Sequence, residues 1–341
     1  MIKFNSDYME GAHPLILKKL TEINLDKIDG YGVDDYCESA KNKIRKACNC
    51  PNADIYFLVG GTQTNALVID ALLSRCDGVL AADTGHINVH EAGAIEAFGH
   101  KVLTMPNING KLSATGVDEY IEQFYADSSN THMVAPGMVY ISYPTEYGTL
   151  YSYQELRELH AVCKSHHIPL FIDGARLGYG LAATGNDVTL ERIAECCDVF
   201  YIGGTKVGAL FGEAIVVTNP EIIKQSMTLI KRHGALLAKG WLLGVQFDTL
   251  FTDNIYLEIS KNAITMAEML KSALIKKGYK FLIDSSTNQQ FPIIDDAKIK
   301  ELEAKVSFNI WERKDSTHTV VRFATSWATT PVQIEELIEL L

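Results

Sequence analysis

Short apolar runs alternate with stretches of helical periodicity between about residue 45 and residue 218 of this chain. This alternation is typical of βαβ units, which build a mostly parallel sheet with helices on its faces. Several runs are apolar throughout, as expected for strands that are covered on both faces. The predicted strands are residues 55–59, 79–82, 101–104, 138–143, 169–172, 199–202 and 214–218.

Helical periodicity dominates the next part of the chain, and strands return near its end. Residues 153–167 already show the 3.6-residue period of an amphipathic helix, and residues 221–277 are mainly helical in pattern. Strand-like runs follow from residue 279 onward. A final helix is predicted to begin at Thr330 or Pro331.

Length and composition fit a globular protein of two domains. The chain has 341 residues, of which 47% are hydrophobic and 21% are charged, a balance typical of globular proteins. We predict an α/β fold whose large domain, with an N-terminal arm, spans residues 1–245. A small C-terminal α+β domain is expected over residues 246–341.

Charge, cysteine content and hydropathy limit the classes of function. The net charge of −11 and the lack of a basic, aromatic-rich stretch argue against nucleic acid. The seven cysteines show neither a disulfide framework nor the spacing of a metal site, so we expect no metal and a reducing compartment. The amino terminus lacks the apolar stretch of a secretory signal, and no run is long enough for a membrane span. The expected location is the cytoplasm.

Two predicted strands end in residues that carry chemistry. The strand at 199–202 is followed by small residues and then Lys206, and the strand at 169–172 is followed by Asp173 and Arg176. Ligands of open α/β sheets bind where the carboxyl ends of parallel strands meet. A lone lysine after a strand is more often a solvated loop residue. Here an amine, a carboxylate and a guanidinium converge, so we interpret this edge as the site.

A glycine-rich turn follows the strand at 55–59. Gly60 and Gly61 lead into Thr62, which opens an amphipathic helix. Free backbone N–H groups and the helix dipole at such an end bind phosphate. The three-glycine spacing of a Rossmann fold and the lysine of a P-loop are both missing, so a dinucleotide or a nucleoside triphosphate is the weaker interpretation. A threonine that only caps its helix is the structural alternative.

Pyridoxal phosphate (PLP) requires the three groups that this edge brings together. It needs a helix end for its phosphate, a carboxylate that keeps its pyridine nitrogen protonated, and a lysine that forms a Schiff base. The glycine-rich turn, Asp173 and Lys206 supply these groups in that order along the chain. We therefore predict PLP as the cofactor, with Asp173 making its ring an electron sink.

The motifs around these residues resemble those of low-specificity threonine aldolases, which lie within the aromatic amino acid β-eliminating lyase group of fold type I PLP enzymes. The resemblance covers nearly the whole chain and includes the motifs GYGVDD, GGTQTN, HINVHEAGA, FIDGARL, GGTKVGALFG and VVRFATSW. It implies the PLP-dependent transferase-like fold. It also implies a lyase that cleaves the Cα–Cβ bond of 3-hydroxy amino acids, so that threonine or allo-threonine yields glycine and acetaldehyde.

The resemblance assigns roles to residues by position. His86 looks like the imidazole that stacks on the cofactor ring near the reacting bond. Arg176, also at the cofactor, and Arg322 look like the pair that grips the carboxylate of the amino acid, joined by the hydroxyl of Ser6. The structural alternatives are a helix-start histidine for His86 and an ion pair for Arg322, whose apolar strand makes an unpaired charge costly.

Two further assignments cross a subunit boundary. Lys239 occupies the region where relatives carry a basic residue that reaches the cofactor phosphate of a neighbouring subunit. Tyr31 resembles a tyrosine that likewise contributes to the active site of the neighbouring subunit. An exposed lysine and a packed tyrosine explain these residues equally well. The resemblance implies a homodimer or a homotetramer made of two dimers.

One position departs from the family pattern. Members usually have Thr-His-Asn-Gly where this chain has Thr-Glu-Tyr-Gly, so Glu146 replaces a histidine implicated near the hydroxyl of the substrate. Glutamate is the weaker base by about two pKa units unless burial raises its pKa, yet a carboxylate can still accept the hydroxyl proton. The base is expected to be Glu146, His86 or a water that they hold. A solvated loop glutamate is the alternative for Glu146.

Two other functions stay open at this point. One keeps the cofactor but changes the bond, as in β-elimination or another lyase reaction on a different amino acid side chain. The other is a catalytically silent protein that has retained the fold.

Overall fold

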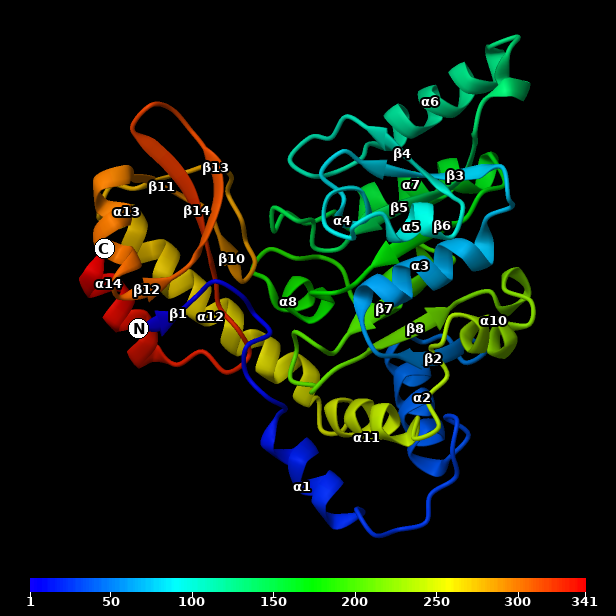
Figure 1. The fold of residues 1–341 in the computed structure, drawn as a ribbon, viewed down its shortest axis with the longest axis horizontal. Coiled ribbons are helices and arrows are strands. Elements are labelled where there is room, and N and C mark those ends of the chain that lie inside the picture. The colour runs from blue at the N-terminus through cyan, green and yellow to red at the C-terminus, as the bar shows by residue number, and fades with distance from the viewer.

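The computed structural model describes residues 1–341 and is built around a seven-stranded sheet (Figure 1). The strand order is β2-β8-β7-β6-β5-β3-β4. All pairs from β7 to β4 are parallel, whereas β8 is antiparallel to both β2 and β7. All seven predicted strands are confirmed with small shifts at their ends. Their bounds are β2 Asp54–Leu58, β3 Asp77–Ala82, β4 Lys101–Met105, β5 Ala135–Ser142, β6 Leu170–Asp173, β7 Val199–Gly203 and β8 Glu213–Val217.

Helices cover both faces of this sheet, which explains why its strands are apolar throughout. Phe200 and Ile202 pack into a cluster with α2, α6 and α7. Val199 and Tyr201, which alternate with them, pack with α3, α5 and α10 on the other face. The helices and 3₁₀ turns of this part are α1 Pro14–Glu22, α2 Asp35–Ala47, α3 Gly61–Leu72, α4 His86–Val89, α5 Ala94–Ala97, α6 Ala114–Ala126, η1 Asn130–His132, α7 Tyr153–Ser165, α8 Leu177–Ala182, α9 Leu190–Glu195, η2 Pro220–Ile222, α10 Ser226–Arg232 and α11 Trp241–Leu250.

A smaller lobe follows along the long helix α12, and both chain ends lie beside it (Figure 1). The first strand, β1, pairs in parallel with β12, and Phe4 belongs to the apolar cluster of this lobe. The final helix begins at Pro331 after the N-cap Thr330, which forms a capping box with Gln333. The elements of the lobe are β1 Ile2–Lys3, α12 Ile255–Lys276, β9 Lys280–Phe281, β10 Gln289–Gln290, β11 Pro292–Asp295, α13 Asp296–Glu303, β12 Val306–Ser307, β13 Asn309–Arg313, β14 His318–Ala324 and α14 Pro331–Leu340.

The expected domain boundary after residue 245 falls within α11, which spans Trp241–Leu250. The division of the chain into two domains at that residue stays a prediction. No helix combines the length and the apolar content that a membrane crossing requires.

Candidate active site

Two adjoining cavities open at the carboxyl ends of β5, β6 and β7. The inner one, of about 120 Å³, contains Asp173 and the start of α3. The outer one, of about 560 Å³, extends to β13 and β14 of the small lobe. Four residues line both cavities: His86, Glu146, Arg176 and Lys206. The predicted site residues from separate strand ends therefore do meet at one edge of the sheet.

Asp173 ends β6 at the floor of the inner cavity and is 4% exposed. Burial alone would raise its pKa, but the charge of His86 and hydrogen bonds to the carboxylate outweigh burial and lower it. Asp173 is thus held as a carboxylate. Its hydrogen-bond donors are the hydroxyls of Tyr140 (2.6 Å) and Tyr201 (2.5 Å), the amide of Asn65 (3.0 Å) and the backbone N–H of Ala175 (3.0 Å).

His86 opens α4 and is oriented by a second buried carboxylate. Its Nδ1 lies 2.8 Å from Oε1 of Glu91, whose side chain is fully buried. Burial would lower the pKa of His86, but the hydrogen bond to Glu91 and the charge of Asp173 raise it. The amide of Asn65 donates to Glu91 at 2.7 Å and to Asp173 at 3.0 Å. This amide therefore ties the histidine and the strand-end acid into one network.

Lys206 lies in the loop between β7 and β8 and faces both cavities. Burial, and then the neighbouring charge of Arg176, lower the pKa of its amine. No carboxylate lies within ion-pair distance of this amine, and its Nζ is 5.9 Å from the ring centre of Tyr8. A lysine with a lowered pKa is more often uncharged and is therefore a better nucleophile.

The glycine-rich turn differs in detail from the expectation. Helix α3 begins at Gly61 with Gly60 as its N-cap, so Thr62 does not cap it, and no side chain does. The backbone N–H groups of Gly61, Thr62 and Gln63 find no partner. A Cβ at Gly60 would meet nothing within 4 Å. Free donors beside open space, at the end of a helix that lines the inner cavity, are suited to an anion.

Arg176 is already engaged by a carboxylate of the chain itself. Its Nε and Nη2 donate to the two oxygens of Asp7 at 2.6 and 3.0 Å. Burial opposes the ionisation of Asp7, but the charges of Arg176 and Lys206 lower its pKa nonetheless. The hydroxyl of Ser6 is buried without a partner, so the expected link between Arg176 and Arg322 through this hydroxyl is not formed. Arg176 thus lines both cavities while Asp7 holds its Nε and Nη2, which leaves Nη1 without a carboxylate of the chain.

Arg322, on β14, lacks any carboxylate partner in the chain. Nη1 donates to Gln289 at 3.0 Å and Nη2 to the carbonyl of Asn5 at 3.2 Å, but Nε is buried without a partner. Burial, and then the charge of Arg176, lower its pKa to about 10. The structural ion pair that was the alternative for Arg322 is therefore not formed. A partly buried cation that lines the outer cavity without a counterion attracts an anionic ligand.

Glu146 is partly buried at the junction of the two cavities rather than fully solvated on a loop. Its Oε1 accepts hydrogen bonds from Ser142 Oγ at 2.6 Å and from the backbone N–H of His86 at 2.9 Å. Burial raises its pKa, and the nearby charge of Asp173 adds to the rise. Both effects make Glu146 a stronger base than an exposed glutamate.

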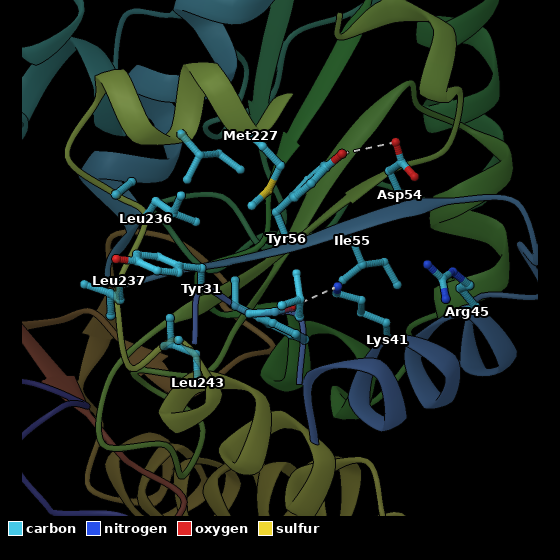
Figure 2. Close-up of a pocket in the computed structure, with 16 residues that line it drawn as sticks. Tyr31, Lys41, Arg45, Asp54, Ile55, Tyr56, Met227, Leu236, Leu237 and Leu243 are labelled. Carbon is cyan, nitrogen blue, oxygen red and sulfur yellow. Dashed lines mark hydrogen bonds between the residues drawn. The ribbon is translucent and has the colours of Figure 1, made fainter. Parts of the chain in front are cut away.

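Tyr31 and Lys239 do not line either cavity. Tyr31 borders a separate pocket of about 290 Å³, where Figure 2 shows it among Leu236, Leu237 and Leu243. Its backbone N–H donates to the carbonyl of Ala238 at 3.1 Å, so the loops of Tyr31 and Lys239 are joined. Tyr31 is 49% exposed and has a φ of 62°, an uncommon value for an aromatic residue.

The inner cavity suits PLP in its charge pattern. An anion-binding helix end, an ionised acid and a weakly basic lysine surround it. Buried oxygens without partners, Asn65 Oδ1 and Glu91 Oε2, also mark this site. No group of three or more histidine, cysteine or acidic side chains is placed to hold a metal ion.

Several residues of the site were missed by the sequence reasoning. One of them carried a signal, because Glu213 is a charged residue at the start of a buried apolar strand. The others depend on tertiary contacts that leave no local pattern. The missed residues are Asp7, Asn65, Glu91, Tyr140, Tyr201 and Glu213.

The fold and this site define a fold type I PLP enzyme. An aspartate aminotransferase of Thermus thermophilus shares the fold, with a TM-score of 0.72 at 15% identity over 100% of this chain and 90% of that one. A model of the beta-eliminating lyase family matches residues 3–296, and the chain belongs to this family. The predicted family, fold class and cofactor are confirmed.

Two relatives match over nearly their full length. The structure of a threonine aldolase from Leishmania major has a TM-score of 0.96 and 40% identity, and covers 100% of this chain and 98% of its own. A low-specificity L-threonine aldolase from a Pseudomonas species is 27% identical over 338 residues, which are 98% of this chain and 95% of that protein.

Proposed function

We propose that this protein cleaves the Cα–Cβ bond of 3-hydroxy amino acids, so that threonine or allo-threonine yields glycine and acetaldehyde. The observation that carries the proposal is the partly buried guanidinium of Arg322, whose buried Nε has no partner and which has no carboxylate partner while lining the cavity shared by Lys206 and Glu146. Its two closest polar partners are neutral oxygens. An amino acid carboxylate supplies the missing charge.

Each residue of the proposed site has a definite task. When bound, PLP supplies an aldehyde for Lys206 and a ring that accepts the electron pair of the broken bond. Asp173 would hold the proton of the ring nitrogen, and the free N–H groups of α3 would bind the phosphate. The imidazole of His86, oriented by its hydrogen bond to Glu91, would stack on the pyridine ring of the cofactor. Arg322 and Nη1 of Arg176 bind the substrate carboxylate and orient the Cα–Cβ bond.

Glu146 is the proposed base for the β-hydroxyl proton. It lines the outer cavity together with His86 and Arg322. Its Oε1 is occupied by Ser142 and a backbone N–H, which leaves Oε2 for the substrate hydroxyl. Removal of that proton allows the oxygen to form a carbonyl as the carbon–carbon bond breaks.

Tyr31 and Lys239 are proposed to act in the site of a second copy of the chain, in a homodimer or homotetramer. Their support is their position on joined loops away from Lys206, with Tyr31 half exposed. A cytoplasmic location is also proposed, because all seven cysteines are free and five are buried.

Aldehyde release tests the proposal. Purified protein with PLP is incubated with L-threonine, L-allo-threonine and phenylserine, and aldehyde and glycine are measured in equal amounts. Ammonia and a keto acid without aldehyde would instead support β-elimination. No aldehyde from any of the three substrates would reject the proposed reaction.

A further inference from the structure

Glu213 is a buried carboxyl group that none of the roles above uses. It is 3% exposed and opens β8, whose other residues are apolar. Its Oε1 accepts a hydrogen bond from Thr205 Oγ1 at 2.9 Å, whereas its Oε2 is buried without a partner. A carboxylate in such a place is costly because burial removes its hydration.

The loop that carries Lys206 is joined to Glu213 by strand pairing and by hydrogen bonds. Gly203, at the end of β7, pairs with Glu213 across the ladder, so both ends of the loop meet there. The backbone N–H of Gly212 donates to Thr205 Oγ1 at 2.9 Å, and this hydroxyl donates to Glu213. Because Thr205 directly precedes Lys206, the position of the carboxyl is fixed relative to the lysine.

Glu213 and Lys206 influence each other's charge. Burial raises the pKa of Glu213 to about 8, and Lys206 is the main effect that opposes this rise. Burial and Arg176 lower the pKa of Lys206, while Glu213 acts in the opposite direction. The charge of each group therefore affects the ionisation of the other. The other titratable groups that face Glu213 are Asp173, Tyr201 and Tyr256. Those that face Lys206 are Arg176, Asp7, Asp173, His86 and Tyr8.

We propose that Glu213 is a positioning residue that remains a neutral carboxylic acid at neutral pH and thereby leaves Lys206 free to react as an uncharged amine. At higher pH the carboxyl loses its proton to solvent, and the resulting carboxylate favours the ammonium form of the lysine. An ammonium group cannot attack an aldehyde. This inference rests on the proposed function, since it takes Lys206 as the amine that binds the cofactor.

The pH dependence of cofactor attachment tests the inference. PLP is added to the apoprotein, and the rate of its covalent attachment is followed by absorbance between about pH 6 and pH 10, a range that spans both groups. Glu213→Gln cannot ionise. Its rate is expected to match the wild-type rate below about pH 7 and to exceed it about tenfold above about pH 8, since a neighbouring carboxylate shifts a lysine by about one pKa unit or more.

Two matched variants control this experiment. Glu258→Gln makes the same change on the exposed face of α12 and should follow the wild-type profile. Lys206→Ala should abolish the signal. Superimposable profiles for Glu213→Gln and wild type overturn the inference, whereas the absence of any attachment in the wild-type protein contradicts the proposed function instead.

Infrared titration of the wild-type protein gives a readout that needs no folded variant. A protonated carboxyl has a C=O stretch distinct from that of a carboxylate. We expect this band at pH 7 and its loss with a midpoint at about pH 8. A protein without such a band at pH 7 overturns the inference.

Discussion

The carboxyl edge of the large sheet and the joined loops of Tyr31 and Lys239 both hold residues assigned to the site, but only the first region is assembled within one chain. At the sheet edge, Lys206, Asp173 and Glu146 line shared or adjoining space. Tyr31 lines a different pocket. Sheet polarity alone brings strand ends together, whereas the loop residues are proposed to act in a second copy of the chain.

Lys206→Ala gives the largest expected effect and tests the first region. Loss of the covalent nucleophile should lower kcat for aldehyde release on the order of 10⁶-fold, as when the nucleophile of another covalent enzyme is removed. The purified variant should also lack the absorbance of covalently attached PLP. Substantial activity in this variant would place the chemistry on another residue.

Glu146→Gln should lower kcat by about 10³-fold, because the amide cannot accept the hydroxyl proton. Km should change little, since the side chain keeps its size and its bond from Ser142. Steady-state aldehyde assays separate the two constants. Normal kcat in this variant would transfer the role of base to His86 or to water.

The pH profile of kcat sharpens the same assignment. The base must be ionised, so activity is lost as pH falls through the pKa of Glu146. Burial raises this pKa. The fall of kcat at low pH should therefore have its midpoint above the ordinary pKa range of a glutamate. If kcat of Glu146→Gln still falls at the same low pH as in the wild type, the ionising group is a different residue.

Arg322→Leu should raise Km by roughly 100-fold, equivalent to the loss of about 3 kcal/mol from a buried, charge-assisted contact. Arg313→Leu is the matched control on the neighbouring strand, because Arg313 pairs with Asp296 and is half exposed. Equal Km values for the two variants would show that Arg322 does not bind the substrate carboxylate.

Lys239→Ala gives the smallest expected effect and tests the second region. Loss of one partly solvated charge near the phosphate should weaken PLP binding by about tenfold, or about 1.4 kcal/mol. Equilibrium titration with PLP measures this change, with Lys276→Ala at the exposed end of α12 as a control. Unchanged PLP affinity in Lys239→Ala would show that Lys239 does not contact the phosphate in the site of a second copy.

The same contrast explains how far the sequence could predict the site. Lys206 and Asp173 follow apolar runs, and parallel strands place such residues at one edge without further information. Asp7 could not be assigned to Arg176, because the two are 169 positions apart and only the folded arm brings them together. Thr62 was wrongly read as opening its helix, because the choice of Gly60 as N-cap depends on the backbone path from β2.

Reduction of the holoprotein with borohydride, followed by peptide mass mapping, tests the proposed site most directly. Reduction makes the bond between PLP and its lysine permanent, so the modified peptide identifies the amine. We expect one modified residue, Lys206. A pyridoxyl group on any other lysine, or a protein that carries none, would contradict the assignment of the whole strand-end site.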